Sequence, residues 1–231
     1  MKTNLLLELA LSVFFSGALN AGHYINPSAQ SVSQIPPPPA NGSNADKLDL
    51  AALHEWQEKR TPAECERAKS ETNASYEEVF GTVSPFPKPI PKKAAAILAG
   101  IKADTDAAVV VLKDHYARRR PFKRDPSLHP CIDPALGKIG AFAYPSGHTT
   151  ITRVFALLLS ELVPAEKEIF MAKADDAARN RIVAGVHHPS DIDAGKRLAD
   201  GLYAQFKKVP AFKQDIGRLR ALLLKKSAAA P

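Results

Sequence analysis

Nineteen prolines interrupt this chain of 231 residues, and their positions limit where regular structure can form. Proline breaks the interior of a helix and the middle of a sheet, but it fits the first turn of a helix. The four consecutive prolines at 36–39 therefore predict an extended polyproline segment. The prolines at 85, 87, 89 and 91 exclude regular structure from that stretch in the same way.

Apolar residues recur at helical spacing between these prolines, and no segment shows the alternation of a strand or an internal repeat. The sequence from Thr61 to Glu64 is typical of a helix start, with a capping threonine, a proline and a capping-box glutamate. The other predicted helices cover residues 48–60, 92–119, 146–163, 164–186, 190–206 (capped by Ser190) and a stretch from 210 onward. We therefore predict an all-α protein, a single-domain helical bundle.

The N-terminus is typical of a secretory signal, because Lys2 precedes a mostly apolar stretch that only Glu8 interrupts. We expect a signal peptide at 1–21, an extended proline-rich segment at 22–45 and an α-helical domain at 46–231. An N-terminal core helix is the alternative. No other stretch approaches the ~18 apolar residues of a membrane span. We therefore expect a mature protein without a membrane span, in the periplasm or outside the cell.

The formal net charge of +7 favours anionic partners. The basic residues come in pairs and triplets without interleaved aromatic residues, and no nucleic-acid-binding motif is present. We therefore predict no specific nucleic-acid partner.

Two cysteines, Cys65 and Cys131, are far apart in the sequence and lack the spacing of metal ligands. In an oxidising compartment they can form a disulfide that restricts the unfolded chain. Two separate buried thiols are the alternative. The sequence leaves both open.

Three groups of charged and polar residues between positions 113 and 191 predict chemistry on a phosphoryl group. They are Lys113-x6-Arg120-Pro121, Pro145-Ser146-Gly147-His148 and Arg181-x5-His187-x3-Asp191. Their three cations suit a phosphoryl group, because its charge is spread over three oxygens. Two histidines and a carboxylate supply a nucleophile, a residue that orients it and a proton donor.

Helix geometry predicts how the first two groups present their side chains. Lys113 and Arg120 are seven residues apart, so both can project from one face of a helix that stops before Pro121. Ser146 and Gly147 stand at the start of a helix, where unpaired N–H groups and the helix dipole favour an anion.

The third group combines a nucleophile with its orienting carboxylate. Asp191 follows His187 by four residues, across a break at Pro189. It can hold one ring nitrogen of His187 as N–H, which leaves the lone pair of the other nitrogen for attack. Arg181, six residues before His187, is close enough to share the pocket.

These three groups resemble the signature of the type 2 phosphatidic acid phosphatase superfamily, which shares its site with the vanadium haloperoxidases. The chain is most similar to the bacterial class A non-specific acid phosphatases. The resemblance covers roughly residues 35–220 and includes the segments 35–40, 113–116, 120–122, 184–187 and 210–212. It implies a helical bundle of the superfamily's kind.

The resemblance also implies an activity: metal-independent hydrolysis of small phosphomonoesters through a phosphohistidine, with no cofactor and no metal ligands. His187 would attack phosphorus, Asp191 would orient it, and His148 would act as general acid and then base. The implied phosphate-binding residues are Lys113, Arg120, Ser146, Gly147, Arg181 and Asn180. The family usually has serine where this chain has Asn180, whose amide can also donate to a phosphate oxygen. Because His148 must be protonated while His187 is not, we expect acidic operation.

Other functions for these residues stay open. The same site serves phosphatases of lipid or other specialised phosphate esters, vanadium haloperoxidases and, without catalysis, phosphate-binding proteins. A haloperoxidase is disfavoured in so short a chain, and a binding protein needs neither the histidines nor Asp191. We assign no role to His188 and no metal site to the cluster at His54. The physiological substrate and the oligomeric state, a homo-oligomer included, remain open.

Overall fold

The structure, a computed structural model, describes residues 24–26, 34–133 and 139–227, with side chains up to residue 223. The expected signal peptide at 1–21 lies outside this range. The helices are α1 (Asn44–Lys59), α2 (Pro62–Ser70), α3 (Tyr76–Phe80), α4 (Lys92–Tyr116), α5 (Pro121–Arg124), α6 (Gly147–Leu162), α7 (Lys167–Val183), α8 (Pro189–Phe206) and α9 (Pro210–Ser227), with a 3₁₀ turn, η4, at Pro164–Glu166. Within the described residues the only β-type contact is an isolated bridge between Arg119 and Phe142. The predicted all-α class is confirmed.

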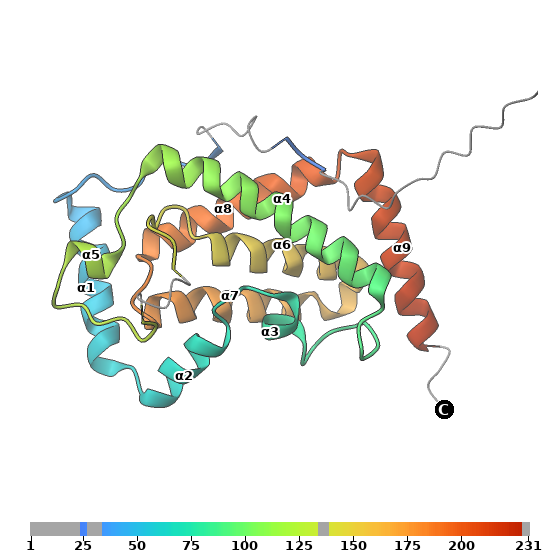
Figure 1. Cartoon of the computed structure of the whole chain (residues 1–231), viewed down its shortest axis with the longest axis horizontal. Helices are drawn as coiled ribbons and strands as arrows, with labels where there is room; N and C mark the ends of the chain where they lie inside the picture. Colours follow the sequence, from blue (N-terminus) through green and yellow to red (C-terminus); the bar gives the residue numbers. More distant parts are fainter. Residues whose placement is uncertain (1–23, 27–33, 134–138, 228–231) are drawn as a thin grey trace, which may run out of the picture.

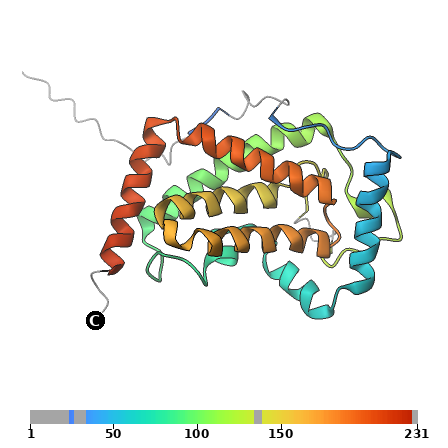
Figure 2. The ribbon, with the colours of Figure 1, turned by 180° about the vertical axis from the view of Figure 1, so that it is seen from behind.

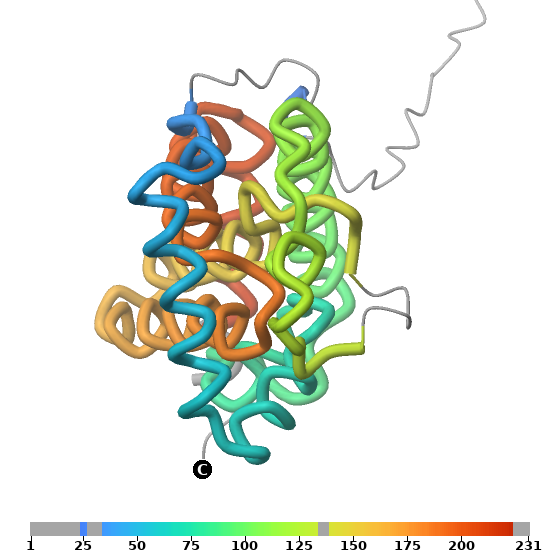
Figure 3. Tube along the Cα trace, turned by 90° about the vertical axis from the view of Figure 1, so that its left-hand side faces the viewer, coloured from blue at the N-terminus to red at the C-terminus, as the bar shows by residue number. Residues whose placement is uncertain are grey.

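Helix α6 forms the centre of the bundle and packs against α4, α7 and α8. Figures 1 and 2 show these helices running along the long axis of the molecule, with α9 crossing one end. Figure 3, seen from the opposite end, shows α1 lying across it. The sequence of α6 suits this position, because Phe155, Leu158 and Leu159 are almost completely buried. None of the helices in the described part of the chain is long and apolar enough to cross a membrane.

Helix α4 ends at Tyr116 rather than at residue 119, because Ala117 adopts a left-handed conformation with φ 46°. Arg120 is therefore not helical: with φ −63° and ψ 151° it is extended and precedes the short helix α5, which we did not predict. The prediction that Lys113 and Arg120 share one helical face is wrong. The direction of the Arg120 side chain is therefore set by the turn at Ala117 and not by helical periodicity.

Other helix ends also differ from prediction: α1 begins at Asn44 rather than at 48, which shortens the expected extended segment, and α7 begins at Lys167, after η4, rather than at 164. Helix α7 ends at Val183 rather than at 186, and Gly185 then takes a left-handed φ of 73°. Helix α8 begins at Pro189, with His188 and not Ser190 at the cap position. The N–H of His188 donates to the Asp191 carboxylate at 2.8 Å, which gives this helix start its cap.

A disulfide joins Cys65 in α2 to Cys131, with the two Cα atoms 5.4 Å apart. Of the two possibilities that the sequence left open, a disulfide and two separate buried thiols, the structure shows the disulfide. The N–H of Cys131 donates to the carbonyl oxygen of Ala184 at 2.9 Å, just beyond α7. The disulfide thus ties α2 to a segment that packs against the turn before His187.

Candidate active site

A cavity of about 290 Å³ gathers side chains from all three sequence groups. The predicted site residues that line it are Lys113, Arg120, Gly147, His148, Arg181 and His187. Its outer wall includes Thr72 and Asn73 after α2, and Lys102 and Asp106 of α4. The predicted residues thus meet in one place, although the sequence separates them by up to 74 positions (187 − 113).

Helix ends supply most of the cavity. Lys113 lies in the last turn of α4, His148 in the first turn of α6 and Arg181 in the last turn of α7. Arg120 follows the turn at Ala117, and His187 lies between α7 and α8. Helix ends carry unpaired backbone groups and side chains that point beyond the helix, so several can converge on one ligand.

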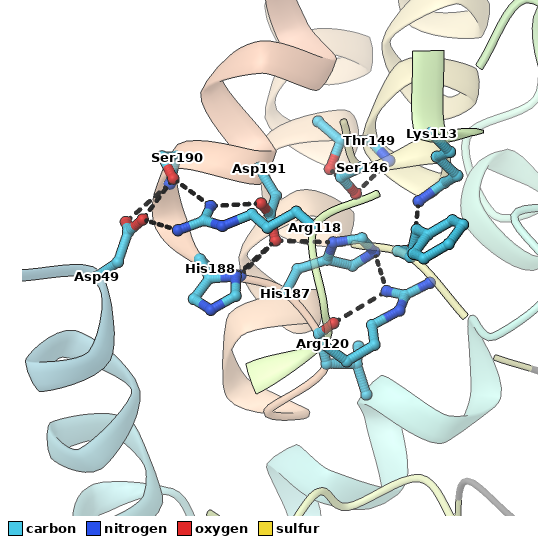
Figure 4. A network of polar contacts seen from close by, with 12 residues as sticks. Asp49, Lys113, Arg118, Arg120, Ser146, Thr149, His187, His188, Ser190 and Asp191 are labelled. Atoms are coloured by element: carbon cyan, nitrogen blue, oxygen red, sulfur yellow. Dashed lines mark hydrogen bonds and ion pairs between the residues drawn. The ribbon is translucent and has the colours of Figure 1, made fainter. Parts of the chain in front are cut away.

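Hydrogen bonds to both ring nitrogens determine the tautomer of His187 (Figure 4). Nη1 of Arg120 donates to Nε2 at 2.7 Å, and Nδ1 lies 3.3 Å from Oδ2 of Asp191. Arginine can only donate and an ionised carboxylate can only accept, so Nδ1 carries the proton and Nε2 the lone pair. The lone pair of Nε2 faces the cation of Arg120 at the cavity, where an anionic ligand would be held.

Asp191 is fully buried, and each of its oxygens has partners. Oδ1 accepts from Nη1 of Arg118 at 2.6 Å, and Oδ2 accepts from the N–H and Nδ1 of His188 at 2.8 and 2.9 Å. Burial by itself raises the pKa of Asp191, but hydrogen bonds from His187 and His188 outweigh it and hold the pKa well below its usual range. These hydrogen bonds therefore favour the ionised form of Asp191.

Both cavity histidines are neutral in the unliganded protein. Burial, followed by the charge of Arg120, holds the pKa of His187 well below its usual range. Burial, followed by the charges of Arg181 and Lys102, does the same for the pKa of His148. Both ring nitrogens of His148 lack a hydrogen-bond partner among the described residues. An unpartnered, buried imidazole at a cavity wall can donate to or accept from a ligand there.

Three predicted site residues that line this cavity, Lys113, Arg120 and Arg181, are cationic, in addition to Lys102 on its wall. Nζ of Lys113 donates to the carbonyl oxygen of Phe142 at 2.7 Å. Burial, and after it the charge of Arg120, lowers the pKa of Lys113 to about 7. Burial lowers the pKa of Arg120 and of Arg181 to about 10, so both arginines stay charged near neutral pH. Cations held this close repel one another, and a bound polyanion would relieve that repulsion.

The family model of the PAP2 superfamily matches residues 94–199, the stretch that carries all three groups. The chain contains a PAP2 superfamily domain. The family resemblance stated from the sequence is confirmed. Helix α1 and helix α2 precede the matched stretch, and α9 follows it.

Proteins related to this PAP2 chain bear phosphatase names. The non-specific acid phosphatase of Salmonella typhi is 27% identical over 223 residues, 93% of this chain and 88% of the relative. The non-specific acid phosphatase of Providencia stuartii is 29% identical over 198 residues, 82% of this chain and 79% of the relative. The acid phosphatase of Zymomonas mobilis is 36% identical over 116 residues, 49% of this chain and 43% of the relative.

Two solved structures share the fold of the PAP2 domain. A transmembrane PAP2-type phosphatidylglycerolphosphate phosphatase from Bacillus subtilis superposes with a TM-score of 0.51 at 20% identity, covering 72% of this chain and 87% of that one. A bacterial vanadium-dependent iodoperoxidase superposes with a TM-score of 0.56 at 18% identity, covering 76% and 52%. They confirm the predicted kind of helical bundle.

The structure does not bring two of the predicted phosphate-binding residues to the wall of the cavity in the PAP2 domain. The amide of Asn180 donates to Glu71 at 2.8 Å and accepts from Arg67 at 3.3 Å, which links it to the C-terminal end of α2. A phosphate contact of Asn180 stays a prediction. The Ser146 hydroxyl caps α6, since it accepts from the N–H and hydroxyl of Thr149 at 3.3 and 2.9 Å. A phosphate contact of Ser146 stays a prediction.

Sequence reasoning missed the charged residues behind His187. Arg118 reaches Asp191, but it belongs to a run of three arginines that suggested a solvated surface. Asp46 and Asp49 are buried on α1 together with Leu53. Carboxylates at the spacing of a buried apolar stripe are the signal that could have revealed this cluster.

No group of three or more His, Cys, Asp and Glu side chains in the described residues is arranged to hold a metal ion. His54, whose surroundings resemble a metal cluster in the sequence, pairs with Asp125 at 2.9 Å. Among the residues that line the cavity, cationic side chains outnumber the one carboxylate, Asp106, and this excess of positive charge suits an anion.

Proposed function

We propose that this protein is an acid phosphatase that hydrolyses small phosphomonoesters through a phosphohistidine on His187, without a metal ion. One observation carries the proposal: Nε2 of His187 has its lone pair in a cavity that Lys113, Arg120 and Arg181 line, while Nδ1–H is held by buried Asp191. The names of the relatives, non-specific acid phosphatase among them, support the activity.

In the first step, the phosphoryl group displaces the Arg120 contact to Nε2 and takes that guanidinium as its own partner. The lone pair of Nε2 forms the N–P bond while the ester P–O bond breaks, and the electron pair leaves with the ester oxygen. Lys113, Arg120 and Arg181 neutralise the charge that develops on the phosphoryl oxygens. Asp191 stabilises the charge that His187 gains.

His148 acts as the proton carrier of both steps. Protonated His148 donates to the leaving oxygen, and neutral His148 then takes a proton from the water that attacks phosphorus. That attack breaks the N–P bond and returns the electron pair to Nε2. The product is inorganic phosphate, and both histidines are restored.

Acidic operation follows from the environment of His148. Its pKa in the unliganded cavity is lowered by burial and by the charges of Arg181 and Lys102. A bound phosphoryl dianion offsets those charges and raises the pKa, so substrate and low pH both favour the protonated form that donates. We therefore expect turnover to fall as the pH rises above neutrality.

The mature protein is tested with p-nitrophenyl phosphate, first alone, then with EDTA, then with vanadate. We expect turnover that survives EDTA and is inhibited by vanadate, an analogue of the five-coordinate transition state. His187→Ala is expected to abolish turnover. A loss of activity in EDTA would contradict the metal-free mechanism, and phosphate binding without turnover would favour a binding protein.

The intermediate is tested separately, by rapid mixing with ³²P-labelled substrate and denaturation in alkali, in which phosphohistidine survives. Label on the wild type and none on His187→Ala is the expected result. His188→Asn serves as a second control, because it keeps a side-chain N–H near Asp191 and leaves His187 in place. Label that persists in His187→Ala would assign the nucleophile elsewhere.

We also infer that the protein is exported to the periplasm or beyond. The signal-like N-terminus supports this, and so does the disulfide between Cys65 and Cys131, because disulfides persist in oxidising compartments. N-terminal sequencing of the protein from a periplasmic extract is expected to begin near residue 22. Full-length protein confined to the cytoplasm would refute export.

A further inference from the structure

Arg118 lies behind the catalytic cavity and connects Asp191 to helix α1 (Figure 4). Nη1 donates to Oδ1 of Asp191 at 2.6 Å and to the hydroxyl of Ser190 at 2.7 Å. Nη2 donates to Asp49 at 2.8 Å and to Asp46 at 3.3 Å. Arg118 does not line the cavity, so it can act on substrate only through other residues.

We propose that Arg118, held by Asp49 of α1, is a positioning residue that fixes the Asp191 carboxylate and thereby orients His187 for attack. The inference rests on the function proposed above, because it concerns the same nucleophile. It assigns a part of the active site to α1, which lies before the PAP2 domain in the sequence.

The hydrogen-bond lengths support the proposal that Arg118 fixes Asp191 and that Asp191 in turn orients His187. The contact between Asp191 and His187 is the longest that the carboxylate makes, at 3.3 Å, whereas the contact to Arg118 is the shortest, at 2.6 Å. Short charge-assisted hydrogen bonds are the stronger ones. The carboxylate therefore takes its position from Arg118 and from the N–H of His188 on its other oxygen, and His187 follows that position.

Asp49 binds both Arg118 and Ser190, the residue directly before Asp191. Its Oδ2 accepts from Arg118 at 2.8 Å, and its Oδ1 accepts from the N–H of Ser190 at 3.0 Å. Ser190 also donates its hydroxyl to Asp49. Asp49 thus fixes the guanidinium of Arg118 relative to the first turn of α8, which carries Asp191.

Burial explains why α1 takes part, because the N–H groups of Arg118 that do not reach Asp191 need another acceptor. The side chains of Arg118, Asp49 and Asp191 are 5%, 6% and 0% exposed, so none is well hydrated. A buried ion needs opposite charge and hydrogen bonds to offset its lost hydration. An arginine serves here better than a lysine, because its rigid fork reaches carboxylates on two helices with separate N–H groups.

The test is a double-mutant cycle on Arg118 and Asp191, with kcat and KM measured on p-nitrophenyl phosphate. We expect Arg118→Gln to lower kcat by roughly 10²-fold and to change KM little, because misplacement of a catalytic group by about 1 Å costs that much. In the Asp191→Asn background, Arg118→Gln should cost less than about threefold, since residues that act as a unit are not additive.

A second pair of variants keeps the test valid if Arg118→Gln does not fold. Asp49→Asn retains the shape of the side chain and is expected to lower kcat about tenfold, again only when Asp191 is present. Arg118→Lys should recover part of the kcat that Arg118→Gln loses. Arg153→Gln is the matched control: Arg153 makes an exposed two-bond contact to Asp200, at 2.7 and 3.0 Å, and its loss should leave kcat unchanged.

The outcomes separate the two proposals. Losses from Arg118→Gln or Asp49→Asn that add fully to that of Asp191→Asn would overturn the positioning role, as would a rise in KM at constant kcat. An unchanged kcat in Asp49→Asn would show that α1 has no part in positioning Asp191. A wild type that turns over no phosphomonoester would instead overturn the proposed function, and this inference with it.

Discussion

Among the cations of the cavity, Lys113 is the residue whose charge changes within the working pH range. Burial and the charge of Arg120 lower its pKa to about 7, against the opposing effect of Asp191. Lysine is cationic below its pKa, so Lys113 attracts phosphoryl oxygens below pH 7 and loses that attraction above it. Arg120 and Arg181, with pKa values lowered only to about 10, keep their charge.

We therefore expect the affinity for sulfate, measured as its inhibition constant, to weaken as the pH rises through about 7. Sulfate is chosen because it stays a dianion over this range. Lys113→Met should bind sulfate more weakly at pH 5.5 and should lack the change in affinity near pH 7. If Lys113→Met showed the same pH dependence as the wild type, another group would be responsible.

At the scale of helices, the site depends on a close contact between α6 and α8. The N–H of Ser146 donates to the main-chain oxygen of Asp191 at 2.9 Å, which ties the turn before His148 to the helix that orients His187. Gly195 permits this approach: a Cβ built there would lie 2.7 Å from the Ser146 carbonyl oxygen and 3.1 Å from Thr149 Cβ. Packing therefore requires glycine at position 195, because the backbone there has no left-handed φ that would need one.

Gly195→Ala is expected to lower the free energy of unfolding by about 1–3 kcal/mol, because the added methyl forces the two helices apart. Gly201→Ala in the same helix is the matched control, since a Cβ there meets nothing within 4 Å. It should raise the free energy of unfolding by up to about 1 kcal/mol through helix propensity. Urea unfolding of both variants measures the difference, and equal effects would contradict the packing argument.

At the scale of the whole molecule, the disulfide links α2 to the segment that follows α5, which is far from α2 in the sequence. Cys65 and Cys131 are 66 positions apart, and the loop they close contains α3, α4 and α5. Closing a loop of that length restricts the unfolded chain substantially. The crosslink therefore stabilises the cavity, whose outer wall includes residues after α2.

Cys65→Ala with Cys131→Ala is expected to lower the free energy of unfolding by about 2–4 kcal/mol. The melting temperature of the wild type should fall on addition of dithiothreitol, measured by circular dichroism. The double variant should not respond to dithiothreitol, which controls for effects of the reductant. A wild type insensitive to reduction under unfolding conditions would contradict the stabilising role.

Helix content and most site residues could be predicted, because periodicity, caps and motif residues are local features of the sequence. Thr61 caps α2 with the predicted capping box, and Pro210 begins α9 as expected. The errors have identifiable causes. Ala117 ends α4 in a left-handed conformation that alanine seldom adopts, and His188 takes the cap position that Ser190 was expected to hold. The local sequence does not favour the first, and the second rests on the contact between the N–H of His188 and Asp191, which the residue type at the cap position does not reveal.

The sequence alone determined the helical class and the residues of the proposed phosphate site, because both follow from residue types at short spacings. Only the tertiary structure decided what surrounds the nucleophile. Asp49 and Asp191 lie 69 and 73 positions from Arg118 in the sequence, yet one buried guanidinium binds both. Such pairing depends on how α1 packs against α8, because buried charges are stable only where the fold brings their counter-charges together.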